Sequence, residues 1–308
     1  MPNSKEEFKP SGKPVAVIFS NFHRGIDNTD ASAFEITRAY VGYKYTMIEQ
    51  LSGNITFNVA NPESGKLDQV AFLKFASLTY VYNNLSVDFG LIPTLQFKEQ
   101  EKYWGHRYIF KSYADEYKLN NSVDFGTNII CKIGEKLSLD ASVYNGEGYK
   151  KLQSDKTFRY CSGFTLSPIK DLIIRGYYDN SIKTYSQETV SGFVGYKYKK
   201  AMVGAEYNYQ FNNAFKYLHE IGGYSVYLSY DVSKEFQVFG RYDNVSSNAL
   251  YGQSTTWNNK NDGNLIVDGL QYAPTKDVAF ALSCNSWQSD ISGSYPVSSV
   301  FFNVKYSY

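Results

Sequence analysis

The sequence predicts an all-β protein: a transmembrane, antiparallel up-and-down β-barrel of about sixteen strands, with short periplasmic turns and long extracellular loops. Three observations lead to this fold class. Apolar and polar residues alternate along almost the whole chain, the connections between the alternating stretches are short and long in turn, and tyrosine is abundant. A soluble β-sandwich, the main rival fold, explains only the first of these observations.

The alternation has the period of two that is typical of strands with one apolar and one polar face. Leu137, Leu139 and Val143, for example, alternate with Ser138 and Asp140. Similar stretches recur to the end of the chain. The expected strands span residues 14–24, 33–47, 51–61, 70–82, 85–96, 122–132, 136–145, 157–167, 171–180, 188–198, 201–211, 221–232, 235–244, 263–273, 277–287 and 297–308.

The connections between the expected strands sort by length. The short ones lie near residues 48–50, 83–84, 133–135, 167–170, 199–200, 233–234 and 274–276. The long ones span residues 25–32, 62–69, 97–121, 146–156, 181–187, 212–220, 245–262 and 288–296. Because short and long connections take turns, all tight turns should gather at one end of the barrel and all long loops at the other. An even number of strands then places both termini at the short-turn end.

The composition fits a barrel in a membrane better than a soluble protein. The 308 residues include 29 Tyr and 21 Phe, and tyrosine suits a boundary between bilayer and water. The mean hydropathy is only −0.40, as expected if every second strand residue faces a wet lumen. No apolar run approaches the roughly 20 residues that a spanning helix needs. The net charge of +1 argues against a nucleic-acid partner, which would favour a basic surplus.

The chain divides into two expected parts: a periplasmic N-terminal segment, residues 1–13, and a single transmembrane barrel, residues 14–308. The first part has no apolar core of a secretory signal, so we expect that the signal was removed from this sequence. At the other end, residues Val300 to Tyr308 carry aromatic side chains at alternate positions. This strand resembles the terminal signal that the barrel-assembly machinery reads in outer-membrane proteins.

A more specific resemblance is to the phosphate-selective porin O and P family. Phe34 to Tyr43 resembles the second strand of that family. Its next features, a Gly-x-x-Pro step, a long polar loop and a small-polar and Gly strand opening, match Phe89 to Pro93, the loop Phe97 to Asn121 and Asp124 to Gly126. Asn145 to Tyr149 is similar to the turn after the seventh strand of the family. The likeness is greatest to porin-like members from Bacteroidetes-type bacteria.

The resemblance implies a sixteen-stranded, usually trimeric pore in the outer membrane of a Gram-negative bacterium, with its third loop folded into the lumen. The partners expected from it are outer-membrane lipid and lipopolysaccharide, the barrel-assembly machinery through the C-terminal strand, and further copies of the chain in a homotrimer. Nucleic acid is not among the expected partners, and no cofactor or metal is expected.

Phosphate selectivity does not carry over, because it needs a ladder of Lys and Arg along the pore. The expected lining is mixed, which predicts at most a modest anion preference. Its basic members are Arg38, Lys44, Lys132, Arg159, Arg175, Lys197, Arg241 and Lys305. Its acidic members are Asp88, Asp124, Asp140, Asp179, Glu206 and Asp243. The strand neighbours expected to face lipid are Val41, Tyr43, Ile129, Ile174, Val194, Tyr242 and Val304.

The connection 97–121 differs from the other loops because it is rich in both charged and aromatic residues. A solvated loop has no need of Trp104, Tyr108, Phe110 and Tyr113, so we expect these side chains to pack on the inner wall, with a short helical piece possible. The loop is expected to constrict the pore; a folded lid outside the barrel is the alternative. The residues expected to set pore size and charge are Lys102, Arg107, Lys111, Asp115 and Glu116.

The sequence offers little enzyme chemistry. The three histidines, His23, His106 and His219, all fall in or beside expected outside loops, and the three cysteines lack metal-site spacing. The expected function is passive diffusion of small hydrophilic solutes or ions through a water-filled lumen. A channel selective for an anion or an oligosaccharide is the alternative, since aromatic loop residues could stack on sugars. A barrel enzyme and a plugged structural or adhesive barrel are the less favoured readings.

Overall fold

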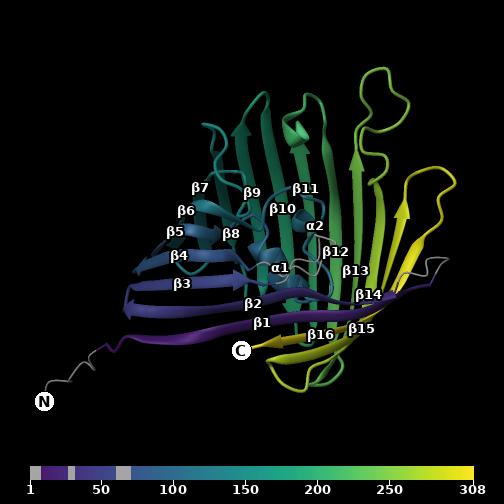
Figure 1. Cartoon of the computed structure of the whole chain (residues 1–308). Coiled ribbons are helices and arrows are strands. Elements are labelled where there is room, and N and C mark those ends of the chain that lie inside the picture. Colours follow the sequence, from purple (N-terminus) through teal and green to yellow (C-terminus); the bar gives the residue numbers. More distant parts are fainter. Residues whose placement is uncertain (1–7, 27–31, 60–70) are drawn as a thin grey trace, which may run out of the picture.

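A computed structural model describes residues 8–26, 32–59 and 71–308, and these residues form a closed barrel of sixteen antiparallel strands (Figure 1). The expected fold class and strand number are confirmed. The strands are β1 Ser11–Gly25, β2 Ser32–Ile48, β3 Leu51–Asn58, β4 Phe72–Tyr82, β5 Leu85–Pro93, β6 Val123–Ile133, β7 Leu137–Tyr144, β8 Arg159–Leu166, β9 Leu172–Ile182, β10 Ser186–Tyr198, β11 Ala201–Phe211, β12 Ile221–Asp231, β13 Phe236–Ser247, β14 Gly263–Tyr272, β15 Val278–Ser289 and β16 Val297–Ser307. The helical pieces are α1 Lys98–Trp104, α2 Tyr113–Glu116 and the 3-10 turn η2 Asn213–Phe215.

The first and last strands close the barrel. β1 pairs with β16 from Val17 opposite Ser307 to Gly25 opposite Ser299. All remaining pairings are between strands that are consecutive in the sequence. Closure leaves no row of unpaired backbone groups along a sheet edge, and such a row is costly inside a bilayer. β1 begins at Ser11, so the barrel starts three residues before the expected boundary at residue 14.

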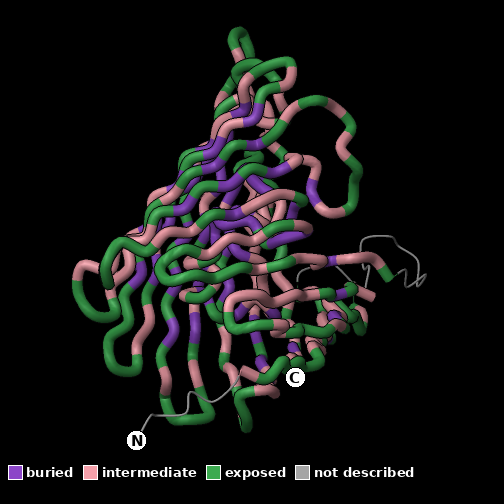
Figure 2. The backbone as a smooth tube through the Cα atoms, turned by 90° about the vertical axis from the view of Figure 1, so that its left-hand side faces the viewer, coloured by how far each residue is buried: buried purple, intermediate pink, exposed green. Residues whose placement is uncertain are grey.

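The two faces of the barrel differ as the alternation in the sequence predicts. Along β12, Ser225, Tyr227 and Ser229 are buried, whereas Val226 and Leu228 are about half exposed. Figure 2 shows this alternation of buried and exposed positions along neighbouring strands. Most of the exposed positions in the barrel wall carry Val, Ile, Leu, Phe or Tyr. A largely apolar exterior around a closed sheet suits a hydrocarbon surrounding.

Besides the register shift between Thr46 and Ile48 beside the β2–β3 turn, two β-bulges change the simple alternation within the described wall. The pairing of β1 with β2 shifts between Phe19 and Ser20, and the pairing of β3 with β4 shifts between Thr56 and Phe57. Each bulge adds one residue to one strand and therefore reverses which parity faces inward. In β2 the bulge lets Ile36 and Val41, which have opposite parity, both lie exposed on the outer face.

The connections sort as expected at one end of the barrel, where seven turns of two to five residues join consecutive strands. The other end carries the long connections, with one exception. β9 and β10 are joined by residues 183–185 alone, so the expected long loop 181–187 is wrong. Ile182 and Ser186 continue the strands instead, and the backbone N–H of Lys183 bonds to the carbonyl of Tyr185. Residues 1–7, most of the expected connection 25–32 and all of the expected connection 62–69 lie outside the described residues.

No helix in the described part of the chain has both the length and the apolar character needed to cross a membrane.

Candidate pore lining and constriction segment

The connection between β5 and β6, residues 94–122, is called the inner segment below. It contains α1 and α2, which confirms the expected helical content of the loop. Gly105 ends α1 in a left-handed conformation with φ of 70°, and its N–H bonds to the carbonyl of Glu101. A residue with a side chain adopts that conformation at a cost, so glycine allows the chain to reverse there.

The aromatic residues of the inner segment pack on the barrel wall, as expected. Trp104 and Tyr108 form a buried cluster with Phe193, Tyr227 and Phe239 of strands β10, β12 and β13. Tyr113 is fully buried in a second cluster with Ile221 and Val245. Burial of several large aromatic side chains stabilises the docked position of the segment against the barrel wall.

Several hydrogen bonds join the inner segment to strands across the barrel. Tyr108 Oη donates to Oε1 of Gln271 on β14 at 2.8 Å, and Tyr113 Oη donates to the carbonyl of Asn244 on β13 at 2.9 Å. Tyr227 Oη of β12 donates to the carbonyl of Gln100 at 3.1 Å. Because β12 to β14 are far around the wall from β5 and β6, these bonds place the segment inside the barrel rather than over its mouth.

Two buried arginines of the wall also bond to the backbone of the segment. Arg175 on β9 forms an ion pair with Asp140 at 2.7 Å, and its Nη2 donates to the carbonyl of Leu95 at 2.8 Å. Arg241 on β13 forms an ion pair with Asp243 at 2.6 Å, and its Nη1 donates to the carbonyl of Lys111 at 2.6 Å. Each guanidinium is therefore neutralised by a neighbouring carboxylate, and its spare N–H groups hold the backbone of the segment.

The five residues expected at the constriction all lie on the inner segment, and the charged ones pair within it. Lys102 bonds to Glu99 at 2.7 Å, Arg107 to Asp115 at 2.6 Å, and Lys111 lies 4.0 Å from Glu116. None of these ion pairs reaches the wall. Arg159 and Arg175 of the wall form no ion pair with these charges. Arg159 contacts Asn120, and Arg175 contacts Asp140 and the carbonyl of Leu95.

The residues expected to line the pore all lie on the inner face of the barrel, but they fall into two groups. One group is buried against the inner segment or beneath the loops and does not face open water: Asp124, Asp140, Arg159, Arg175, Asp179, Glu206, Arg241 and Asp243. Asp124, for instance, accepts hydrogen bonds from the N–H groups of Gly146 and Gly148. The other group is not buried: Arg38, Lys44, Asp88, Lys132, Lys197 and Lys305.

A cavity of about 590 Å³ separates the inner segment from the wall formed by β2, β4 and β5. We call it the lateral cavity. Its charged lining is mainly basic: Arg38, Lys74, Lys98, Lys102 and Arg107, against Asp88 and Glu101. Lys74 is 5% exposed and bonds through Nζ to Ser122 Oγ at 3.1 Å, and Arg38 lies over the rings of Phe19 and Tyr40. Among the described residues neither cation has a carboxylate within ion-pair distance.

Sequence reasoning missed Lys74, Lys98 and Glu101. Lys74 has the same parity in β4 as Leu78 and Tyr80, both of which are exposed on the outer face. The bulge opposite Thr56 and Phe57 lies at Lys74 and turns its side chain inward. No signal in a single strand sequence marks such a bulge. Lys98 and Glu101 lie on α1, whose start and direction the sequence did not define.

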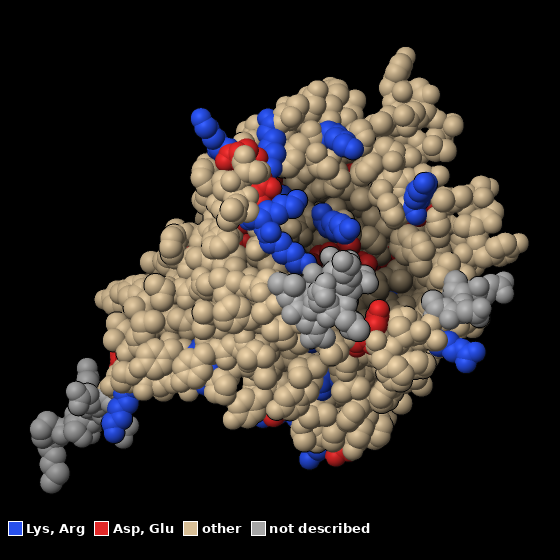
Figure 3. All heavy atoms as spheres, in the orientation of Figure 1, with Lys and Arg blue, Asp and Glu red and all other residues tan. Residues whose placement is uncertain are grey.

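A second cavity of about 930 Å³ opens at the long-loop end, between the inner segment and the connections above β7 to β16. We call it the mouth cavity. Figure 3 shows the molecule hollowed near the centre of the face drawn, with basic and acidic side chains around the hollow. The inner segment contributes to both cavities from adjacent positions, Asn121 to the mouth cavity and Ser122 to the lateral one. The space above and the space beside the segment therefore lie close together.

The histidines and cysteines do not form a metal-binding group in the described part of the chain. His106 lies inside the barrel, not in the outside loop expected for it, and its Nδ1 is 2.7 Å from the carbonyl oxygen of Trp104. Burial lowers the pKa of His106 to about 4, so its ring is neutral at pH 7. Among the described residues, no three His, Cys, Asp or Glu side chains gather as metal ligands would.

No protein-family model matches the sequence. No curated protein matches it either. Solved structures do match. OmpF of Salmonella typhi, described in complex with daunomycin, has a TM-score of 0.74 and 12% identity, with 96% of this chain and 97% of that chain covered.

Two further solved structures are similar. One is a loop-deletion form of OmpT, an outer membrane protein of Vibrio cholerae, with a TM-score of 0.69, 12% identity and coverage of 97% and 99%. The other, described as a porin, has a TM-score of 0.62, 11% identity and coverage of 97% and 100%. The fold is that of a porin. At these identities the likeness establishes the fold alone.

Proposed function

We propose that this chain is an outer-membrane porin that lets small hydrophilic solutes or ions diffuse passively through a water-filled lumen narrowed by the inner segment. One observation carries the proposal. A charged cavity of about 590 Å³ lies between the inner segment and the wall of β2, β4 and β5, next to the larger mouth cavity. Hydrophilic solutes would pass along this charged wall, since the apolar clusters of the segment fill the opposite side.

The lateral cavity supports a modest preference for anions. Five basic and two acidic side chains line it. Lys102 and Arg107 are paired with acids of the inner segment, whereas Arg38 and Lys74 have no such partner among the described residues. Charges at a narrow point act on permeating ions with little screening. This arrangement favours anions without excluding cations, because Asp88 and Glu101 lie in the same cavity.

We also propose, from the sequence resemblance, that the chain is a member of the phosphate-selective porin O and P family. Phosphate selectivity is not part of it. The basic residues that would form a ladder are divided between the lateral cavity and buried ion pairs: Arg175 is held by Asp140, and Arg241 by Asp243. A solute in the lumen meets only the first set.

The location and partners follow from the outer face. The closed sheet with its apolar exterior suits an outer membrane, with lipid and lipopolysaccharide as neighbours. We propose a homotrimer, supported by one similar structure that is described as a trimer form of OmpT. The barrel-assembly machinery would meet β16, whose Phe302 and Tyr306 lie exposed on the outer face. The mass of the detergent-solubilised complex, measured by light scattering, tests the trimer, and a monomeric mass would contradict it.

Single-channel recording in planar bilayers tests the channel. The parent protein should conduct ions in steps, and deletion of residues 103–114 should raise the conductance several-fold while heat-resistant folding is kept. The control is deletion of residues 250–255, which are bounded by the β-bridge from Ala249 to Thr256 and line neither cavity. This control should leave the conductance unchanged. Parent-level conductance after the first deletion would show that the inner segment does not narrow the pore.

A passive channel is favoured over an enzyme, because a solved structure of the same fold is described as a porin. Hydrolysis of lipid or peptide substrates by the purified protein would contradict this part of the proposal.

A further inference from the structure

The mouth cavity combines two kinds of side chain that the channel function does not require. Flat aromatic rings line it, including two of the three tryptophans of the chain: Phe110, Tyr117, Phe215, Trp257, Trp287 and Phe301. Amide side chains line it as well: Asn120, Asn121, Gln187, Gln210, Asn213, Asn258, Asn261 and Asn285. Its volume of about 930 Å³ lies within the range of small-molecule sites, about 300–1,000 Å³.

The aromatic rings are fixed in place by the chain. Trp257 Nε1 donates to the carbonyl of Glu220 at 2.9 Å, and its ring lies 4.9 Å from that of His219. Trp287 lies on the inner face of β15 and packs beside Tyr117 of the inner segment, with ring centroids 6.4 Å apart. The two tryptophans therefore reach the cavity from different walls, β15 and the connection between β13 and β14.

Several amides of the cavity have unused hydrogen-bonding capacity. Gln187 on β10 is 5% exposed, and its side chain bonds to no other described residue. Asn285 lies two positions before Trp287 on β15, and its Oδ1 is buried without a hydrogen-bond partner in the described part of the chain. A buried polar atom without a partner costs free energy, and a ligand can supply the missing bond.

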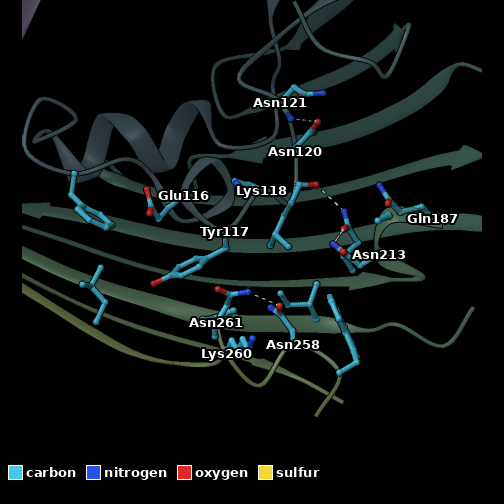
Figure 4. Close-up of a pocket in the computed structure, with 18 of the residues that line it drawn as sticks. Glu116, Tyr117, Lys118, Asn120, Asn121, Gln187, Asn213, Asn258, Lys260 and Asn261 are labelled. Atoms are coloured by element: carbon cyan, nitrogen blue, oxygen red, sulfur yellow. Dashed lines mark hydrogen bonds between the residues drawn. The ribbon is translucent and has the colours of Figure 1, made fainter. Parts of the chain in front are cut away.

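Figure 4 shows the amides around the cavity. Asn258, Lys260 and Asn261 approach from the β13–β14 connection, opposite Tyr117 and Lys118 of the inner segment. An amide both donates and accepts, as a sugar hydroxyl does, whereas a carboxylate or an ammonium does only one. The most buried charged groups are already engaged: Arg159 bonds to Asn120, and Lys183 bonds to Glu147 and Asp155. Three further lysines of the lining, Lys118, Lys151 and Lys260, form no ion pair in the described part of the chain, but all three are exposed to solvent. The buried part of the cavity thus offers amides and ring faces more than free charge.

We propose that the mouth cavity binds a neutral oligosaccharide at the entrance of the channel. Trp257 and Trp287 stack on the faces of sugar rings, and Gln187 and Asn285 bond to the hydroxyls. This inference rests on the proposed channel function and names a substrate class for it. The ring faces cover the C–H surfaces of the sugar, and the amides satisfy its hydroxyls, which is the usual division between apolar walls and a few polar groups in a ligand site.

Current blockade in planar bilayers tests the site, with maltohexaose as the probe added on the long-loop side. The sugar should interrupt the ion current in a concentration-dependent way. Trp257→Ala and Gln187→Leu should each raise the half-blocking concentration at least several-fold. Tyr251→Ala is the matched control: Tyr251 is a fully exposed aromatic residue of the same connection and does not line the cavity. This control should leave the blockade unchanged. Poly(ethylene glycol) of similar size should not give blockades of comparable duration.

Trp257→Phe keeps a flat ring and should retain part of the blockade, which distinguishes stacking from a general loss of loop structure. An ion current that the sugar does not interrupt would overturn the inference and leave the channel intact. Stronger blockade by an acidic sugar than by the neutral one would also overturn it. Absence of any ion current would overturn the channel. In that case, quenching of tryptophan fluorescence by maltohexaose in detergent, lost in Trp257→Ala, would still support the site.

Discussion

Arg241 and Asp243 lie two residues apart on the inner face of β13 and form a bidentate ion pair, with Nε 2.8 Å from Oδ1 and Nη2 2.6 Å from Oδ2. Both side chains are almost completely buried. The remaining Nη1 donates to the carbonyl of Lys111, so the pair also fixes the inner segment. Tyr117 Oη reaches the same carboxylate at 3.2 Å.

Arg241→Met should strongly destabilise the barrel, because it leaves the buried carboxylate of Asp243 without a cation. Removing one partner of a buried pair typically costs about 3–5 kcal/mol. The free energy of unfolding in urea, followed by tryptophan fluorescence, measures the loss. The double variant Arg241→Met/Asp243→Asn should recover part of it, and Arg24→Met, an exposed arginine of β1, should have little effect. An equal loss of unfolding free energy in Arg241→Met and in the control Arg24→Met would contradict the role of the ion pair.

Lys74→Glu should shift the selectivity of the channel toward cations. The substitution replaces a cation of the lateral cavity by an anion at a narrow point, where ionic screening is weak. Reversal potentials under a KCl gradient should show the ratio of anion to cation permeability falling several-fold. Lys136→Glu, an exposed position in the short turn between β6 and β7, is the control. An unchanged reversal potential in Lys74→Glu would place the permeation path elsewhere.

Acidification should loosen the inner segment through His106. Burial lowers its pKa from 6.5 to about 4, so the unfolded chain binds more protons between these values and stability falls as the pH falls. The pKa shift corresponds to about 3 kcal/mol of folding stability, and this amount is fully lost only below pH 4. The positive charge of Lys305 also lowers the pKa of His106. Thermal unfolding from pH 7 to pH 4 measures this, and His106→Gln, which cannot titrate, should show a weaker dependence on pH.

Val226→Lys should impair insertion into bilayers. Val226 is 44% exposed and lies mid-strand on the outer face of β12. A lysine facing lipid at the midplane costs about 2–4 kcal/mol. The yield of folded, heat-modifiable protein in lipid vesicles should fall, whereas Tyr251→Lys in the exposed mouth connection should fold normally. Full insertion of Val226→Lys would indicate that this face does not contact lipid.

The sequence predicted most of the wall, because period-two alternation is a local property that each strand displays by itself. It placed Arg175 and Arg241 on the inner face, but not their contacts with Leu95 and Lys111, which depend on how a connection folds against strands far away in the chain. It also missed Lys74, whose direction depends on a bulge set by pairing with β3. The expected long loop 181–187 is wrong because the two strands continue into it. β9 runs to Ile182 and β10 begins at Ser186, so only residues 183–185 join them.

The closing seam has a consequence for how the chain reaches its native state. β1 and β16 come from opposite ends of the chain, so their pairing is the longest-range contact of the fold and is expected to form slowly. The inner segment lies in the first half of the chain, between β5 and β6, yet it bonds to the later strands β9, β13 and β14. These bonds can form most easily while the sheet is still open. We therefore expect the inner segment to dock on the sheet first, and the pairing of β1 with β16 to close the barrel afterwards.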